Sequence, residues 1–226
     1  MTLTAPAGPA TTPRLSTAVR EGSRAEHEAT EGSPFMTRLL AGGLAPAAYA
    51  DYLRRLRVVY AALERAVRAH AADPAVAAVH DPALERLAAI DADLAHWAPG
   101  PAVTLPVDSP AATAYADRLA AASAQAADGW GGALLAHHYT RYLGDLSGGQ
   151  AIGRLLDRAY DLGGQGTGTA FYAFPGIRPK PYKDAYRARL DALDLDASQV
   201  DAVVAEVRVA FELNGALFAE LDALTD

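Results

Sequence analysis

Residues able to transfer protons gather in one short segment, YTRYLGDLSGGQ, which runs from Tyr139 to Gln150. Arg141 and Asp145 stand four positions apart, so they share one face of a helix. The rest of the segment is largely aromatic or apolar, and a carboxylate buried there would need water or a ligand to satisfy it. The spacing indicates a polar network beside a cavity, although a solvated surface pair is the commoner meaning of such spacing.

Three glycines, Gly144, Gly148 and Gly149, interrupt the same segment. Each glycine costs a helix interior roughly 1 kcal/mol relative to alanine, so their presence needs a reason. A helix without side chains on one face can approach a flat object closely. Two helices joined by a turn explain the glycines equally well, and the glycines alone leave both interpretations open.

The elements that must position these residues are helices. Alanine, leucine, arginine and glutamate dominate, and apolar residues recur at intervals of three and four. Proline-led caps at Ser33 and Ser109 mark two helix starts. The sequence predicts helices over about 15–29, 34–41, 46–71, 82–97, 110–127, 130–160, 182–193 and 198–224. We therefore expect an all-α, single-domain helical bundle over residues 14–226, after a disordered tail over residues 1–13 and with a proline-rich loop over 99–110.

Composition excludes several classes of protein. The formal net charge of −7, with 20 scattered basic residues, disfavours a nucleic-acid binder. No apolar run approaches the roughly 20 residues of a membrane span, so we expect a soluble protein without a membrane partner. The absence of cysteine excludes disulfides and thiolate ligands and is consistent with the reducing cytoplasm. The first thirteen residues also lack the features of a signal peptide.

The segment from Tyr139 to Gln150 resembles the heme oxygenase signature, and the likeness extends from about Leu15 to Leu224. This resemblance implies heme, as both substrate and cofactor, held between a proximal helix and a kinked distal helix. It also implies oxidative cleavage of heme to biliverdin, ferrous iron and carbon monoxide with dioxygen. No flavin or nicotinamide fingerprint is present, so the electrons are expected from an external donor such as ferredoxin or a flavoprotein reductase.

The resemblance also assigns roles to individual residues. The family's proximal motif is a histidine followed four residues later by a glutamate, which HEATE supplies as His27, the axial ligand, and Glu31, its hydrogen-bond partner. Asp145, Arg141 and Tyr60 would form the distal proton network. The implied heme-binding positions further comprise Gly144 and Gly148 on the heme face, Arg20, Arg24, Lys183 and Arg187 near the propionates, and Tyr139, Ser147, Phe211, Asn214 and Phe218 around the pocket. His137 and His138 are interpreted as non-ligands.

Two other functions stay open from the residues alone. A heme-binding or storage protein on the same scaffold would keep His27 without turning heme over, and the presence of Asp145 argues against it. A thiaminase-like or di-iron bundle would need a nucleophilic cysteine or Glu-x-x-His pairs. Glu64, Glu85 and Glu206 each lack a histidine three residues later, which disfavours a di-iron site.

Overall fold

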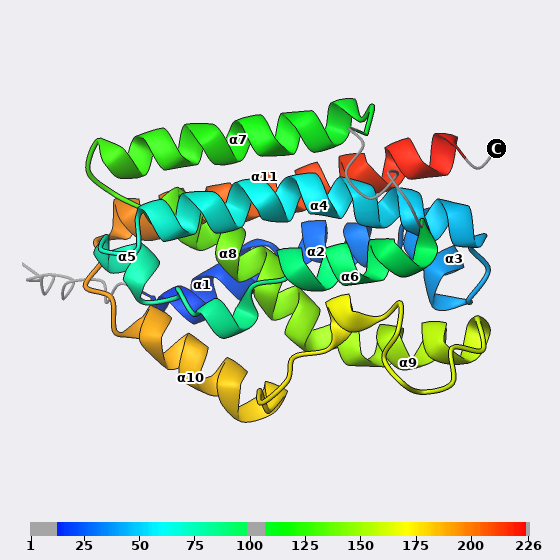
Figure 1. The fold of residues 1–226 in the computed structure, drawn as a ribbon. Coiled ribbons are helices and arrows are strands. Elements are labelled where there is room, and N and C mark those ends of the chain that lie inside the picture. Colours follow the sequence, from blue (N-terminus) through cyan, green and yellow to red (C-terminus); the bar gives the residue numbers. More distant parts are fainter. Residues whose placement is uncertain (1–12, 99–106, 225–226) are drawn as a thin grey trace, which may run out of the picture.

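The computed structural model describes residues 13–98 and 107–224, and every regular element within these ranges is helical (Figure 1). The predicted tail and most of the predicted loop over 99–110 lie outside the described residues. No described helix has the length and hydropathy needed to cross a membrane. The elements are α1 (Leu15–Gly22), α2 (Arg24–Glu31), α3 (Pro34–Leu40), α4 (Pro46–Ala69), α5 (Pro74–Ala77), η1 (Pro82–Leu84), α6 (Leu87–Trp97), α7 (Pro110–Ala127), α8 (Gly132–Gly144), η3 (Asp145–Gly149), α9 (Gln150–Ala159), η4 (Ala170–Tyr172), α10 (Pro179–Asp191) and α11 (Ala197–Ala223). The predicted all-α fold class is confirmed.

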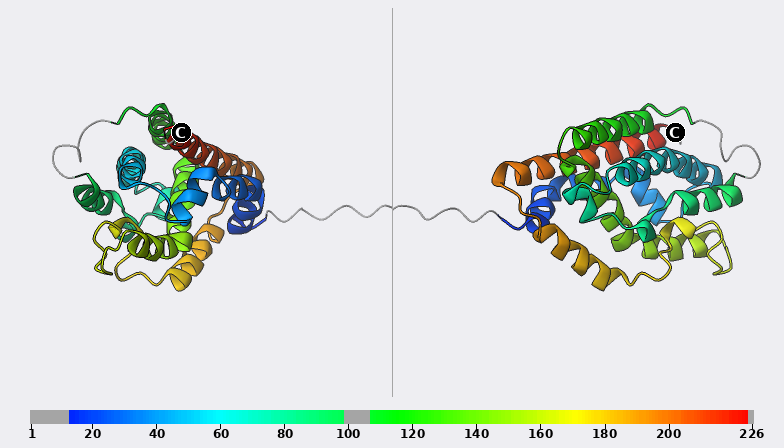
Figure 2. Two further views of the ribbon diagram at one scale, coloured as in Figure 1. Left: turned by 90° about the vertical axis from the view of Figure 1, so that its right-hand side faces the viewer. Right: turned by 60° about the vertical axis from the view of Figure 1, so that its left-hand side comes forward.

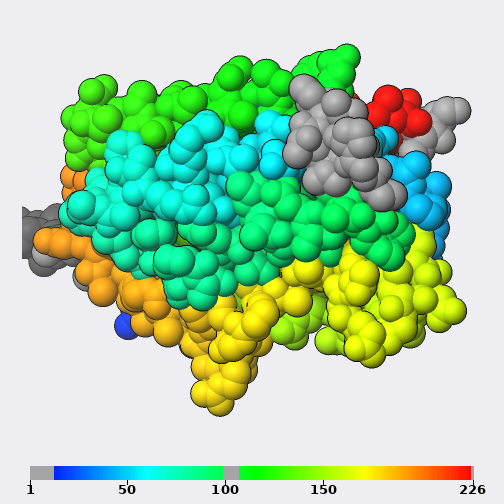
Figure 3. All heavy atoms as spheres, in the orientation of Figure 1, coloured from blue at the N-terminus to red at the C-terminus, as the bar shows by residue number. Residues whose placement is uncertain are grey.

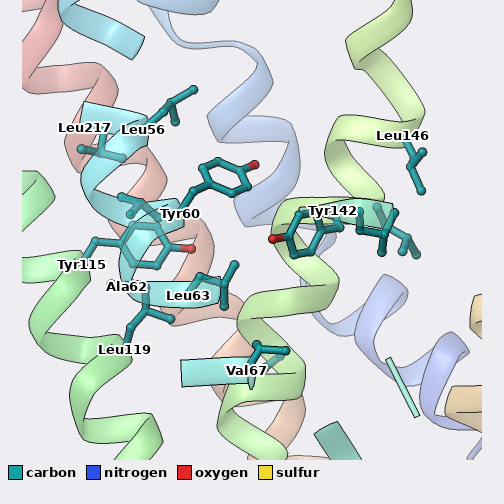
Figure 4. Close-up of a cluster of buried hydrophobic side chains, with 14 of the residues drawn as sticks. Leu56, Tyr60, Ala62, Leu63, Val67, Tyr115, Leu119, Tyr142, Leu146 and Leu217 are labelled. Carbon is teal, nitrogen blue, oxygen red and sulfur yellow. The ribbon is translucent and has the colours of Figure 1, made fainter. Parts of the chain in front are cut away.

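The core lies between the two longest helices and their neighbours. α4 packs against α6 and α7, and α11 packs against α8, α2 and α1. Figure 2 shows α4, α7 and α11 gathered on one side of the molecule, with α9 and α10 on the other. Leu56 and Leu63 of α4 meet Leu119 of α7 and Leu217 of α11 in a cluster of fully buried side chains (Figure 4). This packing fixes the helices that carry the distal network.

The first predicted helix is wrong in one respect, because it breaks into α1 and α2 at Ser23. Ser23 leaves the helical region at φ −117° and ψ 16°, and its hydroxyl donates to the Val19 carbonyl at 2.7 Å. The preceding Gly22 lies so close to α11 that a Cβ there would approach Val204 to 2.5 Å. The break lets α2 turn away from α1 while both remain packed against α11.

The predicted helix over 82–97 is also divided, into η1 and α6. Glu64 of α4 causes the division, because its Oε1 accepts from the backbone N–H groups of Arg86 at 2.6 Å and Leu87 at 2.8 Å. A side chain from another helix thus caps the start of α6. The sequence also did not predict α5, whose cap is Asp73, accepting from Ala75 and Val76.

The predicted helix over 130–160 continues through its glycines without a loop. α8 passes into one π-helical turn, η3, and then into α9. Gly144 keeps helical angles of φ −59° and ψ −53°, so the alternative of two helices joined by a turn is wrong. A π turn inserts one residue into the helical repeat and is frequent at functional sites. We call residues 139–150 the distal segment.

Candidate active site

A cavity of about 680 Å³ opens between α1–α2, the distal segment and α11. Its volume lies within the range of roughly 300–1,000 Å³ typical of small-molecule sites. Most of the predicted site residues line it, namely Arg20, Arg24, His27, Glu31, Tyr139, Arg141, Gly144, Asp145, Ser147, Gly148, Arg187, Phe211, Asn214 and Phe218. Tyr60 and Lys183 do not line the cavity themselves but contact residues that do, Tyr60 through Arg141 and Asp145 and Lys183 through Ser147. The fold therefore brings together residues that are up to 198 positions apart, from Arg20 to Phe218.

The wall formed by α2 presents one imidazole to the cavity. The His27 side chain is 49% exposed, and its ring stands edge-on to Phe211 at 5.4 Å between centroids. Its Nδ1 lies 3.6 Å from Glu31 Oε2, which is longer than the hydrogen bond expected between them. Nε2 has no hydrogen-bond partner among the described residues. The second ring nitrogen is therefore available as a ligand.

The opposite wall carries a hydrogen-bonded network centred on Arg141. Its Nε and Nη2 donate to the Tyr60 hydroxyl at 3.1 and 3.0 Å, and the hydroxyl in turn donates to Asp145. Its Nη1 donates to Asn214 Oδ1, so the guanidinium joins α8 to α4 and α11. The network therefore places the Asp145 carboxylate at the cavity, with Tyr60 and Arg141 held in position behind it.

Burial controls the protonation of this network. Burial raises the pKa of Asp145, and the nearby Arg141 charge and the Tyr60 hydrogen bond lower it, with a net rise above the usual value. Burial also raises the pKa of Tyr60, which stays protonated and can donate. A carboxyl group with a raised pKa beside a phenol can accept and release a proton more readily near neutral pH than an ordinary aspartate.

The glycines of the distal segment have two different surroundings. A Cβ at Gly144 would meet nothing within 4 Å, and one at Gly148 would meet only Ile152 Cδ1 at 4.0 Å. A Cβ at Gly149 or Gly153 would instead press against Tyr172, at 3.2 and 3.0 Å. The first pair leaves open space over the backbone on the cavity side, which suits a flat ligand. The second pair lets Tyr172 pack closely against the helix.

Basic side chains surround one edge of the cavity. Arg20 and Arg24 are exposed on α1 and α2, 3.5 Å from Glu21 and 3.9 Å from Glu28. Across the opening, Lys183 donates to Ser147 Oγ at 3.0 Å. Arg187 lies one turn further along α10 and also lines the cavity. These basic side chains can bind the anionic end of a ligand. Glu21 and Glu28, the acidic neighbours of Arg20 and Arg24, are exposed and remain solvated.

The histidines interpreted as non-ligands point away from the cavity. His137 lies 2.8 Å from Glu206, which also pairs with Arg118. His138 contacts the Tyr186 hydroxyl at 2.9 Å, and burial lowers its pKa to about 3. His138 stands two helical turns before Asp145, but Tyr186 of α10 covers it and it does not line the cavity.

Sequence reasoning missed several cavity residues, among them Met36, Tyr52, Phe171 and Tyr172. Tyr52 stands three positions after Tyr49 in the predicted helix, and that spacing is the signal that could have placed it on an inward face. The aromatic pair 171–172 comes from a segment interpreted as a connection between helices. Its place in the wall depends on the close approach to Gly149 and Gly153, which only the fold reveals.

Comparisons with known proteins agree on one family. The family model described as heme oxygenase matches residues 13–220. Heme oxygenase 1 of Rattus norvegicus is 35% identical over 213 residues, covering 93% of this chain and 72% of the rat protein. A crystal structure of heme oxygenase-2 from Synechocystis sp. with heme and NO matches with a TM-score of 0.87 and 31% identity, over 94% of this chain and 86% of that one. The structure of heme oxygenase from Leptospira interrogans matches with a TM-score of 0.84 and 33% identity, over 92% and 100%. The chain therefore belongs to the heme oxygenase family of heme-degrading enzymes.

Proposed function

We propose that this chain cleaves heme to biliverdin, ferrous iron and carbon monoxide in the cavity between α2 and the distal segment. One observation carries the proposal: the His27 imidazole, whose Nε2 has no partner among the described residues, faces a wall where two glycines expose the backbone beside a half-buried carboxylate. The bound heme would supply both the iron that activates dioxygen and the ring that is opened. The residues of the chain bind it, orient it and control protons.

His27 is proposed to bind the iron through its unpartnered Nε2. A neutral imidazole is a common axial ligand of heme iron. An outer carboxylate that approaches the other ring nitrogen fixes the ring orientation, which is the role proposed for Glu31. The two side chains are 49% and 69% exposed, so packing does not lock them at their 3.6 Å separation. Phe211 supports the same ring from its edge.

Asp145 is proposed to deliver protons on the opposite side. Its raised pKa and its contact with the Tyr60 hydroxyl support this role. Arg141 positions both groups, because its guanidinium is itself held by Asn214. A carboxylate set back against a phenol can order water within the cavity and protonate a ligand indirectly.

The glycine and basic residues are proposed to seat the ring. Gly144 and Gly148 leave room for a flat ligand to rest against the distal backbone. Arg20, Arg24, Lys183 and Arg187 are proposed to pair with the two propionates at the open edge, with Ser147 and Tyr139 beside them. Dioxygen is the proposed co-substrate, and a ferredoxin or flavoprotein reductase is the proposed electron donor.

The test begins with a titration of the purified chain with hemin, followed through the Soret band. Ascorbate or a reductase system is then added under air. Growth of a biliverdin band supports the proposed reaction. Stable heme binding without biliverdin would instead support a heme-storage protein and contradict the enzymatic proposal.

His27→Ala tests the axial ligand. The variant should lose the imidazole-ligated Soret spectrum. His70→Ala should keep it, because His70 is hydrogen-bonded to Ser123 and does not line the cavity. An unchanged spectrum for His27→Ala would show that another group binds the iron. Asp145→Asn should bind hemin normally but form little biliverdin, because an amide cannot carry the proton.

A further inference from the structure

Side chains along α6 hold the backbone of residues 168–173, which we call the strap. The guanidinium of Arg86, the residue before α6, donates to the Ala173 carbonyl. At the other end of α6, the Trp97 indole N–H donates to the Gly168 carbonyl at 2.7 Å. Figure 3 shows α6 and the segment after α9 adjoining at the surface. Both ends of the strap are therefore attached to one helix.

Asp93 of α6 holds the middle of the strap from a fully buried position. Its Oδ1 accepts from the Ala170 N–H at 2.7 Å, and its Oδ2 accepts from the Phe171 N–H at 2.8 Å. A buried charge is costly unless it is well hydrogen-bonded, and the two strap amides supply those bonds. An asparagine could serve only one of the two N–H groups, because one of its two terminal atoms is a donor. Both oxygens of the carboxylate are therefore needed.

The strap carries two rings that contact the distal network. Phe171 and Tyr172 both line the cavity. The Phe171 ring stands edge-on to the Tyr60 ring at 5.5 Å between centroids, and the Tyr60 hydroxyl donates to Asp145. Tyr172 packs closely against Gly149, in the same π turn as Asp145. A shift of the strap would therefore disturb both the phenol that contacts Asp145 and the turn that carries it.

We propose that Asp93 is a positioning residue for heme cleavage, because its carboxylate holds the strap against the distal network. This role rests on the proposed function and adds to it a group that does not line the cavity. Asp93 acts through the strap, whose two rings keep the Tyr60 hydroxyl and Asp145 in place. The ionised carboxylate is the form that performs this role, because protonation turns one of its two acceptors into a donor.

The protonation of Asp93 makes the positioning role depend on pH. Burial raises the pKa of Asp93, the two strap N–H groups and the nearby His96 lower it, and the result is about 6. The α4 group that faces Asp93 is the Tyr49 phenol, which interacts with the Tyr172 phenol of η4. Burial raises the pKa of both phenols, so neither of them titrates near pH 6. Because the pKa of Asp93 is raised in the folded chain, its protonation does not lower the free energy of unfolding.

The first measurement uses the heme-free full chain. The backbone amide resonances of Ala170 and Phe171 are followed by NMR as the pH is varied. Both should shift together with a midpoint of about 6, because both N–H groups bond to the same carboxylate. In Asp93→Asn the two resonances should not titrate in this range. Native resonances that stay constant through pH 6 would overturn the proposal.

The second measurement compares the rate of biliverdin formation in the heme-loaded native chain and Asp93→Asn. At neutral pH the variant should be roughly tenfold slower, because one buried strap N–H loses its acceptor. The Kd for hemin should change by less than about threefold, because His27 lies on another wall. The ratio of native to variant rates should fall toward one as the pH drops below 6, because a protonated carboxyl and an amide each offer one acceptor and one donor. Asp91→Asn, which removes a partly exposed carboxylate paired with Arg57 on the same helix, should match the native chain at each pH.

Equal rates at neutral pH, or a ratio that does not change with pH, would overturn the positioning role. If Asp93→Asn does not fold, Phe171→Leu replaces it, because this variant keeps both backbone N–H groups and removes the ring beside Tyr60. Phe171→Leu should also slow biliverdin formation, and a native rate would overturn the proposal. A native chain that forms no biliverdin contradicts the proposed function instead, and the NMR titration of the heme-free chain still decides whether Asp93 holds the strap.

Discussion

Replacing Gly144 with alanine should stabilise the heme-free protein and weaken heme binding at the same time. Gly144 has helical backbone angles, and an added Cβ would meet nothing within 4 Å. Alanine is favoured over glycine in a helix interior by about 1 kcal/mol, so the free energy of unfolding should rise by about that amount. The new methyl group would occupy the open space over the distal backbone where the heme ring is proposed to rest.

The loss of affinity follows from the distance that the ring must withdraw. A withdrawal of about 1 Å forfeits up to about half of an attraction worth roughly 0.1–0.2 kcal/mol per atom pair. With on the order of twenty pairs over the methyl group, the loss is about 1–2 kcal/mol, or roughly tenfold in Kd. The variant should thus be the more stable protein without heme and the weaker binder with it.

Gly215→Ala on α11 is the matched control. A Cβ at Gly215 also meets nothing within 4 Å, but this residue does not line the cavity. It should give a comparable gain in stability with unchanged affinity. Denaturant unfolding of the heme-free proteins and a Soret titration measure the two quantities. A Gly144→Ala variant that is less stable than the native chain, or that binds hemin equally well, would refute the reasoning.

Three further variants extend the test. Gly153→Ala should destabilise the heme-free protein by about 1–3 kcal/mol in denaturant unfolding, because its Cβ would lie 3.0 Å from Tyr172 Cβ; native stability would contradict this packing. Burial raises the pKa of Glu206, but its hydrogen bonds outweigh burial and lower the pKa to about 2. That carboxylate therefore stabilises the fold above its unfolded pKa near 4.5, and the stability is lost as pH falls toward 2. Glu206→Gln should lower stability at pH 7 by up to about 3 kcal/mol and flatten the acid-unfolding curve, and a curve parallel to the native one would exclude the effect. Arg187→Gln should weaken hemin binding by about 1 kcal/mol or less at low salt, with the difference vanishing at high salt; a difference independent of salt would argue against a charge interaction.

The sequence predicts the helices well wherever the signal is local. Ser33 and Ser109 accept from backbone N–H groups three residues later, as their proline-led caps indicate. The divisions between η1 and α6 and between α1 and α2 could not be predicted in this way. In the first, the capping group is the Glu64 side chain of α4, 22 residues before Arg86. In the second, α11 presses against Gly22.

The residues of the site show the same difference between local sequence signals and contacts that only the fold creates. His27 and the distal segment belong to short motifs, so their residue types and spacing identify them before any fold is known. The spacing of Tyr52 from Tyr49 indicates an inward face but not a place in this cavity, and no local pattern marks Tyr172, which enters the wall only because distant segments meet there. The sequence also could not reveal that Gly149 packs against Tyr172, because that contact depends on a residue 23 positions later in the chain.

The position of Arg141 ties the chemistry of the site to the mechanics of the bundle. Its guanidinium contacts Tyr60 on α4 and Asn214 on α11, so the placement of the Asp145 proton depends on how those two helices are spaced. A conservative substitution in the hydrophobic core that shifts α4 or α11 would alter the rate of heme cleavage, even though the substituted residue does not contact heme. Selection for activity in this protein would therefore also constrain residues that a map of the cavity alone would treat as neutral.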